Sequence, residues 1–248
     1  MNLQEFFQEN PKAAIAFSGG VDSAYLLHCA AFYAKECRAY YVKSAFQPQF
    51  ELDDAVRFCK EAGLPLRVLS VDILACPEVT DNPADRCYHC KKRIFSAIYE
   101  AAREDGYTVL LDGTNASDQA DDRPGMRALS EMKVLSPLRL CGLTKQEIRE
   151  LSKEAGLFTW DKPAYACLAT RIPSGEAITQ EKLTATEEAE GFLFRLGFTD
   201  FRVRLRGETA LIQVPAGQME MVLAHREEIR AELGKYYRGV TLDLTPRG

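Results

Sequence analysis

The sequence predicts an α/β fold in which a parallel sheet carries helices on both faces, followed by a small C-terminal α/β domain. Three observations lead to this expectation. Short apolar runs of strand length alternate with longer segments of helical periodicity, as in proteins built on a parallel sheet. A glycine-rich turn at residues 18–23 joins the first apolar run to the first helical segment. A second polar turn, Gly113-Thr114-Asn115, follows a later apolar run.

The elements of the first domain follow from this pattern. The apolar runs predict strands at residues 13–17, 39–42, 66–71 and 109–112. Helical periodicity predicts helices at residues 24–35, 52–62, 91–103 and 145–155, and Thr144 and Glu147 have the spacing of a capping box at the start of the last one. Ligands of such sheets bind beyond the carboxyl ends of the strands, so the two turns should face one crevice.

A second domain is expected at residues 173–248, after a first domain at residues 1–172. Pro173, Ser174 and Gly175 form turns readily, and a helical pattern then runs to Leu196. The predicted elements beyond it are strands at 201–205 and 210–214, a helix at 218–233 and a strand at 240–244. This segment is too short to bury much core alone, so we expect it to pack on the first domain or on another subunit. Its expected role is that of a substrate-binding and oligomerisation domain.

Composition favours a cytoplasmic protein. The 248 residues are 46% hydrophobic, but the apolar stretches fall far short of the roughly 20 residues that span a bilayer, and the N-terminal residues do not resemble a signal peptide. A net charge of -5 and a pI near 5.4 weigh against broad attraction to nucleic acid, although a local basic patch stays open. Eight cysteines in this setting point to reduced thiols, metal ligands or sulfur chemistry.

The turn at residues 18–23, Ser-Gly-Gly-Val-Asp-Ser, suits a pyrophosphate group. Two glycines let backbone N–H groups approach an anion, Ser18 and Ser23 add hydroxyl donors, and the following helix adds the partial positive charge of its N-terminus. The turn lacks the Lys-Ser/Thr pair of the commoner phosphate loop. It resembles the PP-loop of ATP pyrophosphatases, which cleave ATP between the α and β phosphates. The alternative is an ordinary strand-to-helix turn, which requires fewer of these residues.

Three cysteines form a second candidate site. Cys87 and Cys90 are separated by two residues just ahead of an expected helix, and Cys167 lies far downstream. The remaining cysteines are too scattered for a structural zinc site, and Cys29 and Cys59 have the positions of core residues on helix faces. A pair plus one distant cysteine suits an iron-sulfur cluster with one iron open to a non-protein ligand. A redox dithiol, sulfur-transfer thiols and inert thiols stay open on these residues alone.

A set of arginines offers a binding site for an anionic substrate. Arg202, Arg204 and Arg206 alternate along an expected strand and therefore share one face. Guanidinium groups bind phosphate in bidentate fashion, whereas the alternative is an exposed polar strand face. Arg171, four residues after Cys167, is a further candidate, and Glu190 could orient these arginines.

Several strings resemble the LarE sulfur transferases, in the same order and over nearly the whole chain. These strings are residues 18–23, Asn82-Pro83, residues 86–91, Gly113-Thr114-Asn115 with Asp118, Asp122-Arg123-Pro124-Gly125, Ser136-Pro137-Leu138, residues 160–163 and residues 166–173. The PP-loop is shared with many ATP pyrophosphatases, whereas several of the other strings are specific to this family.

The resemblance implies a role in making the nickel-pincer nucleotide cofactor of lactate racemase and its relatives. The family adenylylates a carboxylate of pyridinium-3,5-biscarboxylic acid mononucleotide, releases pyrophosphate and replaces the acyl oxygen by sulfur, and it does so twice. One branch sacrifices a cysteine at the position of Cys167 and leaves dehydroalanine. Another branch adds a Cys-x-x-Cys and holds a 4Fe-4S cluster whose open iron binds an extra sulfide. Because Cys87 and Cys90 accompany Cys167, this sequence resembles the cluster branch.

The resemblance also assigns roles at the ATP site. The N–H groups of residues 19–22, from Gly19 through Gly20 and Val21 to Asp22, would stabilise the departing pyrophosphate. Ser18 and Ser23 would contact the phosphates, and the Gly113-Thr114-Asn115 turn would complete the site. Mg²⁺ is expected because it bridges phosphates, and Asp22 would position it or instead cap the helix. Lys91 would reach the α-phosphate or the substrate phosphate, unless it is an ordinary solvated lysine.

The remaining roles concern the substrate and the sulfur. Arg202 and Arg204 match an Arg-x-Arg that the family associates with the substrate phosphate. Cys167 would act as a thiolate, with its pKa lowered by bound iron or by Arg171. Trp160 would stack on the pyridinium ring or pack between domains. The family resemblance further implies a homo-oligomer served by a sulfide donor.

Other functions compete with this interpretation. A transfer-RNA thiolase shares the PP-loop and cysteine chemistry but should carry a basic surface or an added RNA-binding module. An amide-forming ligase also adenylylates a carboxylate, yet it gives no reason for Cys87, Cys90 and Cys167. A nucleotide-sensing module would keep the phosphate loop without the three thiols.

Overall fold

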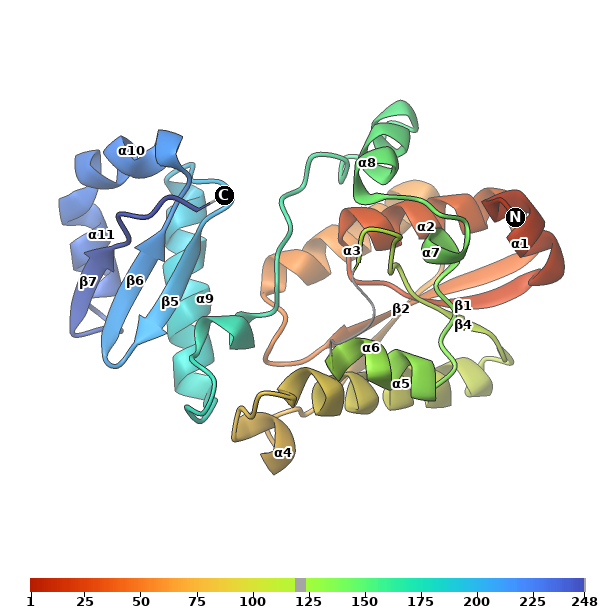
Figure 1. The fold of residues 1–248 in the computed structure, drawn as a ribbon, viewed down its shortest axis with the longest axis horizontal. Coiled ribbons are helices and arrows are strands. Elements are labelled where there is room, and N and C mark those ends of the chain that lie inside the picture. The colour runs from red at the N-terminus through yellow and green to blue at the C-terminus, as the bar shows by residue number, and fades with distance from the viewer. Residues whose placement is uncertain (119–123, 248) are drawn as a thin grey trace. The chain divides into compact units, whose positions relative to one another are not determined.

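The computed structural model describes residues 1–118 and 124–247, and it divides the chain into two compact units (Figure 1). The first unit comprises Met1–Ile73 and Asp85–Lys162, and the second comprises Leu74–Ala84 and Pro163–Gly248. The expected boundary between residues 172 and 173 falls within the second unit. Asp122 and Arg123, which carry part of the family resemblance, lie outside the described residues.

A four-stranded parallel sheet forms the centre of the first unit. Its strands are β1 Lys12–Ala16, β2 Glu36–Lys43, β3 Leu66–Ser70 and β4 Leu110–Leu111. The strand order is β3-β2-β1-β4, and every pairing is parallel, as the sequence predicted. The chain thus builds outward from β1 to β3 and then returns to the other side of β1. The topological switch point lies between β1 and β4, which is where sheets of this kind bind ligands.

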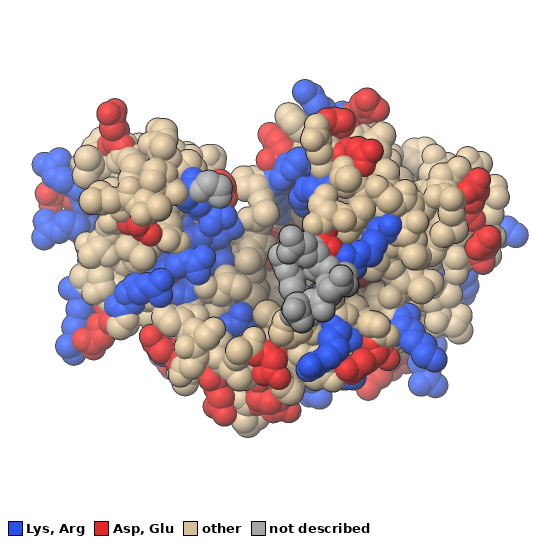
Figure 2. Space-filling model, in the orientation of Figure 1, with Lys and Arg blue, Asp and Glu red and all other residues tan. Residues whose placement is uncertain are grey.

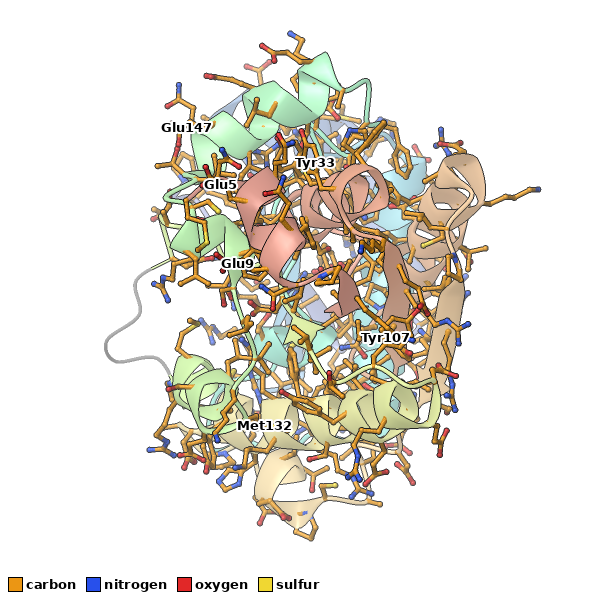
Figure 3. All side chains as sticks on the ribbon, turned by 90° about the vertical axis from the view of Figure 1, so that its right-hand side faces the viewer. Glu5, Glu9, Tyr33, Tyr107, Met132 and Glu147 are labelled. Carbon is orange, nitrogen blue, oxygen red and sulfur yellow. The ribbon has the colours of Figure 1, made fainter. Side chains whose placement is uncertain are left out.

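Helices cover both faces of this sheet. They are α1 Leu3–Glu9, α2 Val21–Tyr33, α3 Gln49–Ala62, α5 Arg86–Glu104, α6 Pro124–Glu131, α7 Pro137–Leu140 and α8 Lys145–Glu154. Ala13 and Ile15 of β1 pack with α1, α2, α3 and α8, whereas Ala14 packs with α5 and α6. In Figure 3, Glu5 and Glu147 mark the first layer of helices, and Met132 marks the second. The alternation of side chains along β1 therefore feeds two separate cores.

The second unit combines a three-stranded sheet with short helices. Its elements are α4 Pro77–Thr80, η1 Leu168–Arg171, α9 Gln180–Arg195, β5 Arg202–Arg206, β6 Thr209–Gln213, η2 Ala216–Gln218, α10 Met219–Ala224, α11 Arg226–Leu233 and β7 Gly239–Leu242. Strand β6 pairs antiparallel with β5 and parallel with β7. A single helix at 218–233 was expected, which is wrong because the backbone of His225 leaves the helical region and separates α10 from α11.

Residues 74–84 join the second unit through Asn82. This side chain is fully buried, and its Nδ2 donates a hydrogen bond of 2.7 Å to the carbonyl oxygen of Pro173. The backbone N–H of Gly175 in turn donates to the Asn82 carbonyl oxygen at 2.9 Å. The Asn82-Pro83 string therefore anchors the start of the C-terminal segment. In the part of the chain that the structure describes, no helix is long and apolar enough to cross a membrane.

Candidate active site

The loop at residues 18–23 follows β1 directly and is closed by its two serines. Ser23 Oγ donates to the Gly20 carbonyl oxygen at 3.1 Å and accepts from the Ser18 N–H at 3.2 Å, and the two hydroxyl oxygens lie 3.0 Å apart. Gly19 has a φ of 74°, a left-handed conformation that glycine adopts at little cost. These bonds fix the loop before any ligand arrives.

Helix α2 begins at Val21, earlier than the predicted residue 24, and Gly20 is its N-cap. No side chain of the described residues caps this end, so the helix presents N–H groups and the positive end of its dipole at the loop. The interpretation of Asp22 as a helix cap is wrong, because Asp22 lies in the first turn of the helix. The uncapped start of α2 is suited to an anion.

The turn after β4 lies against this loop, as expected from the two motifs. A Cβ atom on Gly113 would approach the backbone nitrogen of Ser23 to 2.8 Å and the carbonyl carbon of Asp22 to 3.2 Å, so this close approach requires glycine. Thr114 and Asn115 use their side chains to build the turn. Thr114 Oγ1 donates to Asp112 at 2.6 Å, and Asn115 Oδ1 accepts from the Ser117 N–H at 2.8 Å.

Asp22 has a partner that sequence reasoning missed. Lys145, at the start of α8, places its Nζ 2.5 Å from Asp22 Oδ2, and its backbone N–H donates to Ser117 Oγ at 3.0 Å. Asp22 Oδ1 is buried and has no hydrogen-bond partner among the described residues. A carboxylate oxygen free in this position fits the oxygen ligand that Mg²⁺ prefers. The capping box at Thr144 predicted where α8 begins, but no local signal linked Lys145 to Asp22.

A second missed lysine, Lys162, contacts the loop from another element. Its Nζ donates to the Gly19 carbonyl oxygen at 3.2 Å and lies 2.6 Å from Asp54 Oδ2 of α3. The Lys162 side chain is only 15% exposed. The sequence offered one signal, since Lys162 belongs to the family-specific string at residues 160–163, but no role was assigned to it. In the same string, Trp160 lies beneath Lys153, whose Nζ is 4.7 Å from the ring centroid.

Cys87 and Cys90 lie inside helix α5, not ahead of it as predicted. The helix begins at Arg86, so the two cysteines occupy its first turns. Residues three apart share one face of a helix, and Cys87 is exposed while Cys90 is half-buried. The Arg86 guanidinium donates to Cys87 Sγ at 3.9 Å. Lys91 follows on the same helix, with its aliphatic stem against Gly125 of α6.

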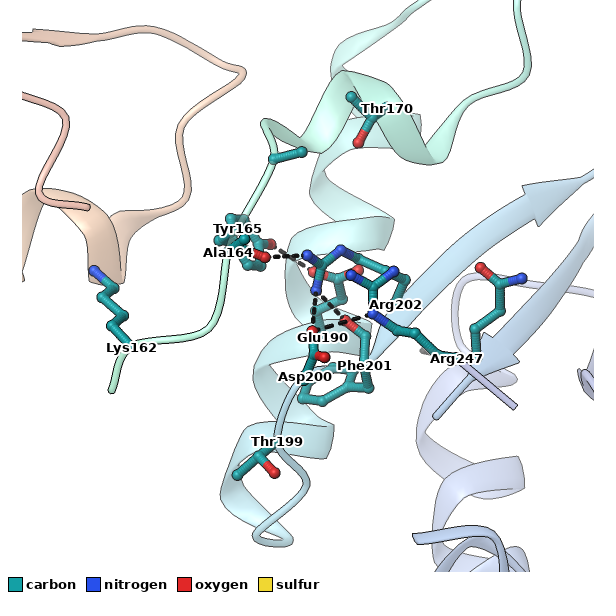
Figure 4. A network of polar contacts seen from close by, with 12 residues as sticks. Lys162, Ala164, Tyr165, Thr170, Glu190, Thr199, Asp200, Phe201, Arg202 and Arg247 are labelled. Atoms are coloured by element: carbon teal, nitrogen blue, oxygen red, sulfur yellow. Dashed lines mark hydrogen bonds and ion pairs between the residues drawn. The ribbon is translucent and has the colours of Figure 1, made fainter. Parts of the chain in front are cut away.

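Cys167 lies in the second unit, where arginines hold the segment that carries it. Cys167 precedes η1 and is half-buried, and its carbonyl oxygen accepts from the Thr170 N–H at 3.0 Å. Arg171 Nη1 donates to the Ala166 carbonyl oxygen at 2.9 Å, and Arg204 Nη1 donates to the Thr170 carbonyl oxygen at 2.7 Å. Arg202 donates to the carbonyl oxygen of Ala164 (Figure 4). The backbone around Cys167 is therefore fixed by guanidinium groups.

Glu190 of α9 connects these arginines to the rest of the unit. Its carboxylate accepts from Arg171 Nε at 2.8 Å, from Arg171 Nη2 at 3.0 Å, from the Tyr165 hydroxyl at 2.5 Å and from the Val203 N–H at 2.9 Å. Glu190 and Arg171 are each 1% exposed. Burial alone would lower the pKa of Arg171, but the bonds to Glu190 outweigh burial and raise the pKa. Glu190 thus orients Arg171 and keeps it charged.

The arginines of β5 carry positive charge that their acidic neighbours balance only in part, since Asp200 Oδ1 lies 3.8 Å from Arg202 Nη1. Burial and the charge of Arg171 lower the pKa of Arg202 to about 10, and the same two causes lower the pKa of Arg204. Arg206 shares their strand face but is exposed. Figure 2 shows Lys and Arg side chains gathered over β5 and β6. An anion placed here would relieve the mutual repulsion of the guanidinium groups.

The thiols expected to share a metal belong to different units. Cys87 and Cys90 lie in the first unit and Cys167 lies in the second. Within residues 1–118 and 124–247, no group of three or more His, Cys, Asp or Glu side chains is arranged to hold a metal ion. The pair on α5 nevertheless supplies two thiols from one helix face, which is the donor type of iron-sulfur clusters.

The fold and the loop together define the class of protein. A parallel sheet with the order β3-β2-β1-β4, a Ser-Gly-Gly-Val-Asp-Ser loop after β1 and a glycine turn after β4 at the switch point are those of a PP-loop ATP pyrophosphatase. No protein-family model matches the chain.

Relatives narrow this class to a family. The chain is 30% identical to the pyridinium-3,5-bisthiocarboxylic acid mononucleotide synthase of Lactiplantibacillus plantarum, over 94% of this chain and 86% of the relative. It is 38% identical to an uncharacterized protein of Synechocystis sp., over 98% of this chain and 92% of that one. A tRNA-specific 2-thiouridylase MnmA of Pseudothermotoga lettingae is more distant, with 26% identity over 88% of this chain and 71% of the relative. The chain belongs to the LarE family and is an enzyme.

Proposed function

We propose that this enzyme is an ATP-dependent sulfur transferase. It activates a carboxylate of pyridinium-3,5-biscarboxylic acid mononucleotide with ATP and converts it into a thiocarboxylate. The single observation that carries the proposal is the preformed anion loop at residues 18–23, set at the switch point of a chain that is 30% identical to a bisthiocarboxylic acid mononucleotide synthase. The product would serve the nickel-pincer cofactor of lactate racemase and its relatives.

The first step is adenylylation. A carboxylate oxygen of the substrate attacks the α-phosphorus of ATP, the bond from that phosphorus to the bridging oxygen breaks, and pyrophosphate leaves. The N–H groups of Gly19, Gly20, Val21 and Asp22 hold the departing charge, and because the loop already fixes them they need no rearrangement during the reaction. The hydroxyls of residues 18 and 23 bond within the loop and would turn toward the phosphates when ATP binds. Mg²⁺ would bind at Asp22 Oδ1 and screen the phosphates.

The arginine cluster of the second unit would bind the phosphate of the mononucleotide. Arg202 and Arg204 donate to neutral carbonyl oxygens, and Asp200, whose Oδ1 lies 3.8 Å from Arg202 Nη1, balances their charge only in part. Arg171 adds a third charge that Glu190 balances. A phosphate here would meet guanidinium groups that also hold the Cys167 segment, so substrate binding and the position of Cys167 would depend on the same residues. Lys91 is a further candidate for a phosphate contact in the first unit.

The second step is sulfur transfer. A sulfur nucleophile attacks the acyl carbon of the adenylate, the bond from that carbon to the AMP oxygen breaks, and AMP leaves with no change of oxidation state. If Cys167 is the nucleophile, it forms a thioester. Loss of its α-proton and cleavage of its Cβ–S bond then leave dehydroalanine and the thiocarboxylate.

The alternative donor is a 4Fe-4S cluster. Its ligands would be Cys87, Cys90 and Cys167, and the cluster when bound supplies a sulfide at its open iron. We favour this arrangement because Cys87 and Cys90 lie on one face of α5 with at least Cys87 open to solvent. It would spare Cys167 and allow repeated turnover with a sulfide donor.

A product assay tests the proposal. The protein, ATP, Mg²⁺ and the pyridinium mononucleotide are incubated with sulfide in the absence of oxygen, and the products are separated and weighed by mass spectrometry. We expect AMP, pyrophosphate and a mononucleotide in which sulfur replaces oxygen. Iron and acid-labile sulfide measured in the wild type, Cys87→Ala and Cys90→Ala separate the two sulfur donors. The cluster requires both iron and acid-labile sulfide to fall in the variants, whereas sacrifice of Cys167 leaves the variants active.

A transfer-RNA thiolase is the second candidate, because the chain resembles the 2-thiouridylase at 26% identity. The arginine face over β5 and β6 is the local basic patch that such an enzyme would use. A gel shift with bulk transfer RNA distinguishes the two, since our proposal expects no retained complex at physiological salt. We further propose that the enzyme works in the cytoplasm as a homo-oligomer, with residues 173–248 supporting assembly.

A further inference from the structure

The peptide between Gly19 and Gly20 is held at both ends, and one end is held by a residue outside the loop. The Gly19 carbonyl oxygen accepts a hydrogen bond of 3.2 Å from Lys162 Nζ. The Gly20 N–H is directed toward Ser18 Oγ at 3.4 Å, on the side where the two serine hydroxyls meet. This peptide is the most adaptable part of the loop, because glycine flanks it on both sides.

The geometry of a peptide unit links these two contacts. In a trans peptide the C=O and the following N–H point in opposite directions, and the unit is planar. A donor that fixes the Gly19 carbonyl oxygen therefore also fixes the direction of the Gly20 N–H. The bond from Lys162 holds the Gly19 carbonyl oxygen on one side of the loop, so the Gly20 N–H faces the other side, which Ser18 and Ser23 line.

Asp54 keeps Lys162 in place. Its Oδ2 lies 2.6 Å from Lys162 Nζ, and the Lys162 ammonium also lies 5.6 Å from the centre of the Phe50 ring. Asp54 and Phe50 both belong to α3, so three separate parts of the first unit meet at this ammonium. A side chain that is 15% exposed and bonded to a carboxylate and a carbonyl has little freedom to leave.

We propose that Lys162 is a positioning residue for ATP cleavage, which acts by holding the Gly19–Gly20 peptide so that the Gly20 N–H points at the pyrophosphate. This inference rests on the proposed function only for its kinetic consequence. Lys162 does not contact the nucleotide in this arrangement. A fixed donor lowers the energy of the charge that develops on the leaving group, whereas a donor that must first turn does so less well.

The sequence allows this peptide to be observed alone. Gly19–Gly20 is the single Gly-Gly dipeptide among 16 glycines. Protein labelled with glycine that carries ¹³C at the carbonyl and ¹⁵N at the amide therefore gives one signal that correlates both nuclei. The carbonyl shift of this signal reports the bond to Gly19, and the amide shift reports the environment of the Gly20 N–H. The other glycine amides report whether the fold is intact.

The test compares the wild type with Lys162→Met, Lys162→Arg and the control Lys60→Met, which removes an exposed lysine of α3. We expect Lys162→Met to move or broaden the Gly19–Gly20 signal and to abolish its response to inorganic pyrophosphate, while Lys60→Met leaves both unchanged. Lys162→Arg keeps a donor and should retain part of the response. An unchanged signal in Lys162→Met, with the other glycine amides also unchanged, overturns the proposal.

Kinetics separate positioning from direct binding. In substrate-dependent exchange of pyrophosphate into ATP, Lys162→Met should lower kcat about tenfold and leave the KM for ATP nearly unchanged, because a misdirected donor retains part of its effect. A higher KM with an unchanged kcat would mean that Lys162 binds the phosphates in the ground state, and this contradicts the proposal. Absence of exchange in the wild type refutes the proposed function instead, and the labelled-peptide experiment still judges Lys162.

Discussion

Replacement of Glu190 by Gln should destabilise the second unit, because it removes the carboxylate that balances the buried Arg171. Both side chains are 1% exposed, and the carboxylate accepts two bonds from the guanidinium and one each from Tyr165 and the Val203 N–H. Gln keeps the shape but not the charge, so Arg171 would remain buried beside other cations. Breaking a buried ion pair in this way costs about 3 kcal/mol or more.

The expected consequence is a large shift in thermal unfolding. At about 3 °C per kcal/mol for a chain of this size, a loss of about 3 kcal/mol lowers the midpoint by roughly 10 °C. Calorimetry of the whole protein measures this midpoint. The matched control is Glu188→Gln, the same change at an exposed position of α9. Inorganic phosphate should stabilise Glu190→Gln more than the wild type, because the variant leaves more positive charge uncompensated. A midpoint for Glu190→Gln within about 1 °C of the control would refute the reasoning.

Three further predictions concern the first unit. Gly113→Ala would place a Cβ 2.8 Å from the Ser23 nitrogen and displace the start of α2. We expect the rate of pyrophosphate exchange to fall at least about a hundredfold, as it does when a fixed donor is lost. An unchanged rate would show that the turn can move to make room. Alkylation at neutral pH should modify the exposed Cys87 before Cys29, because burial raises the pKa of Cys29 to about 11; peptide mass spectrometry gives the order, and early loss of Cys29 contradicts it. Bonds from Tyr40 and neighbouring arginines lower the pKa of Asp105 from 3.8 to about 2, so the stability it provides is present above pH 3.8 and is lost as the pH falls toward 2. The free energy of unfolding, measured in urea, should therefore depend less on pH in Asp105→Asn than in the wild type. The same slope of this free energy against pH in both proteins would argue against it.

The sheet and the motif loops were predictable because local sequence determines them. Strands β1 to β3 fall close to the predicted runs, and the capping box at Thr144 begins α8 as expected. The rule that ligands bind at strand ends predicted that Gly113 lies near the loop. The structure confirms this, because a Cβ atom added to Gly113 would come within 2.8 Å of the Ser23 nitrogen. The order of apolar runs was therefore sufficient to predict the parallel sheet and flanking helices of the first unit.

Helix starts were less predictable because tertiary contacts move them. Helix α5 begins before Lys91 although Cys, Tyr and His are moderate helix formers. The Tyr88 hydroxyl donates to Glu131 at 2.7 Å and Lys92 Nζ donates to the same carboxylate at 2.9 Å, which ties the first turns of α5 to α6. Helix propensity alone does not predict these bonds between α5 and α6. As a result, the sequence placed Cys87 and Cys90 just ahead of the helix instead of within it.

The two lysines of the loop could not be found from sequence because their partners are distant along the chain. Lys145 and Asp22 are 123 residues apart, and Lys162 and Asp54 are 108 residues apart. The shared face of the β5 arginines was predicted by strand periodicity, but their bonds to carbonyl oxygens around Cys167 were not. Bonds from side chains to a remote backbone follow from tertiary structure and leave no local pattern.

The measurement that tests the central claim most directly is exchange of labelled pyrophosphate into ATP, in the wild type and in Cys167→Ala, with the pyridinium mononucleotide present or absent. Thiocarboxylate is quantified in the same samples. The account predicts exchange that depends on the mononucleotide in both proteins, with thiocarboxylate formed by the wild type alone. No substrate-dependent exchange in the wild type, or thiocarboxylate from Cys167→Ala, would contradict it.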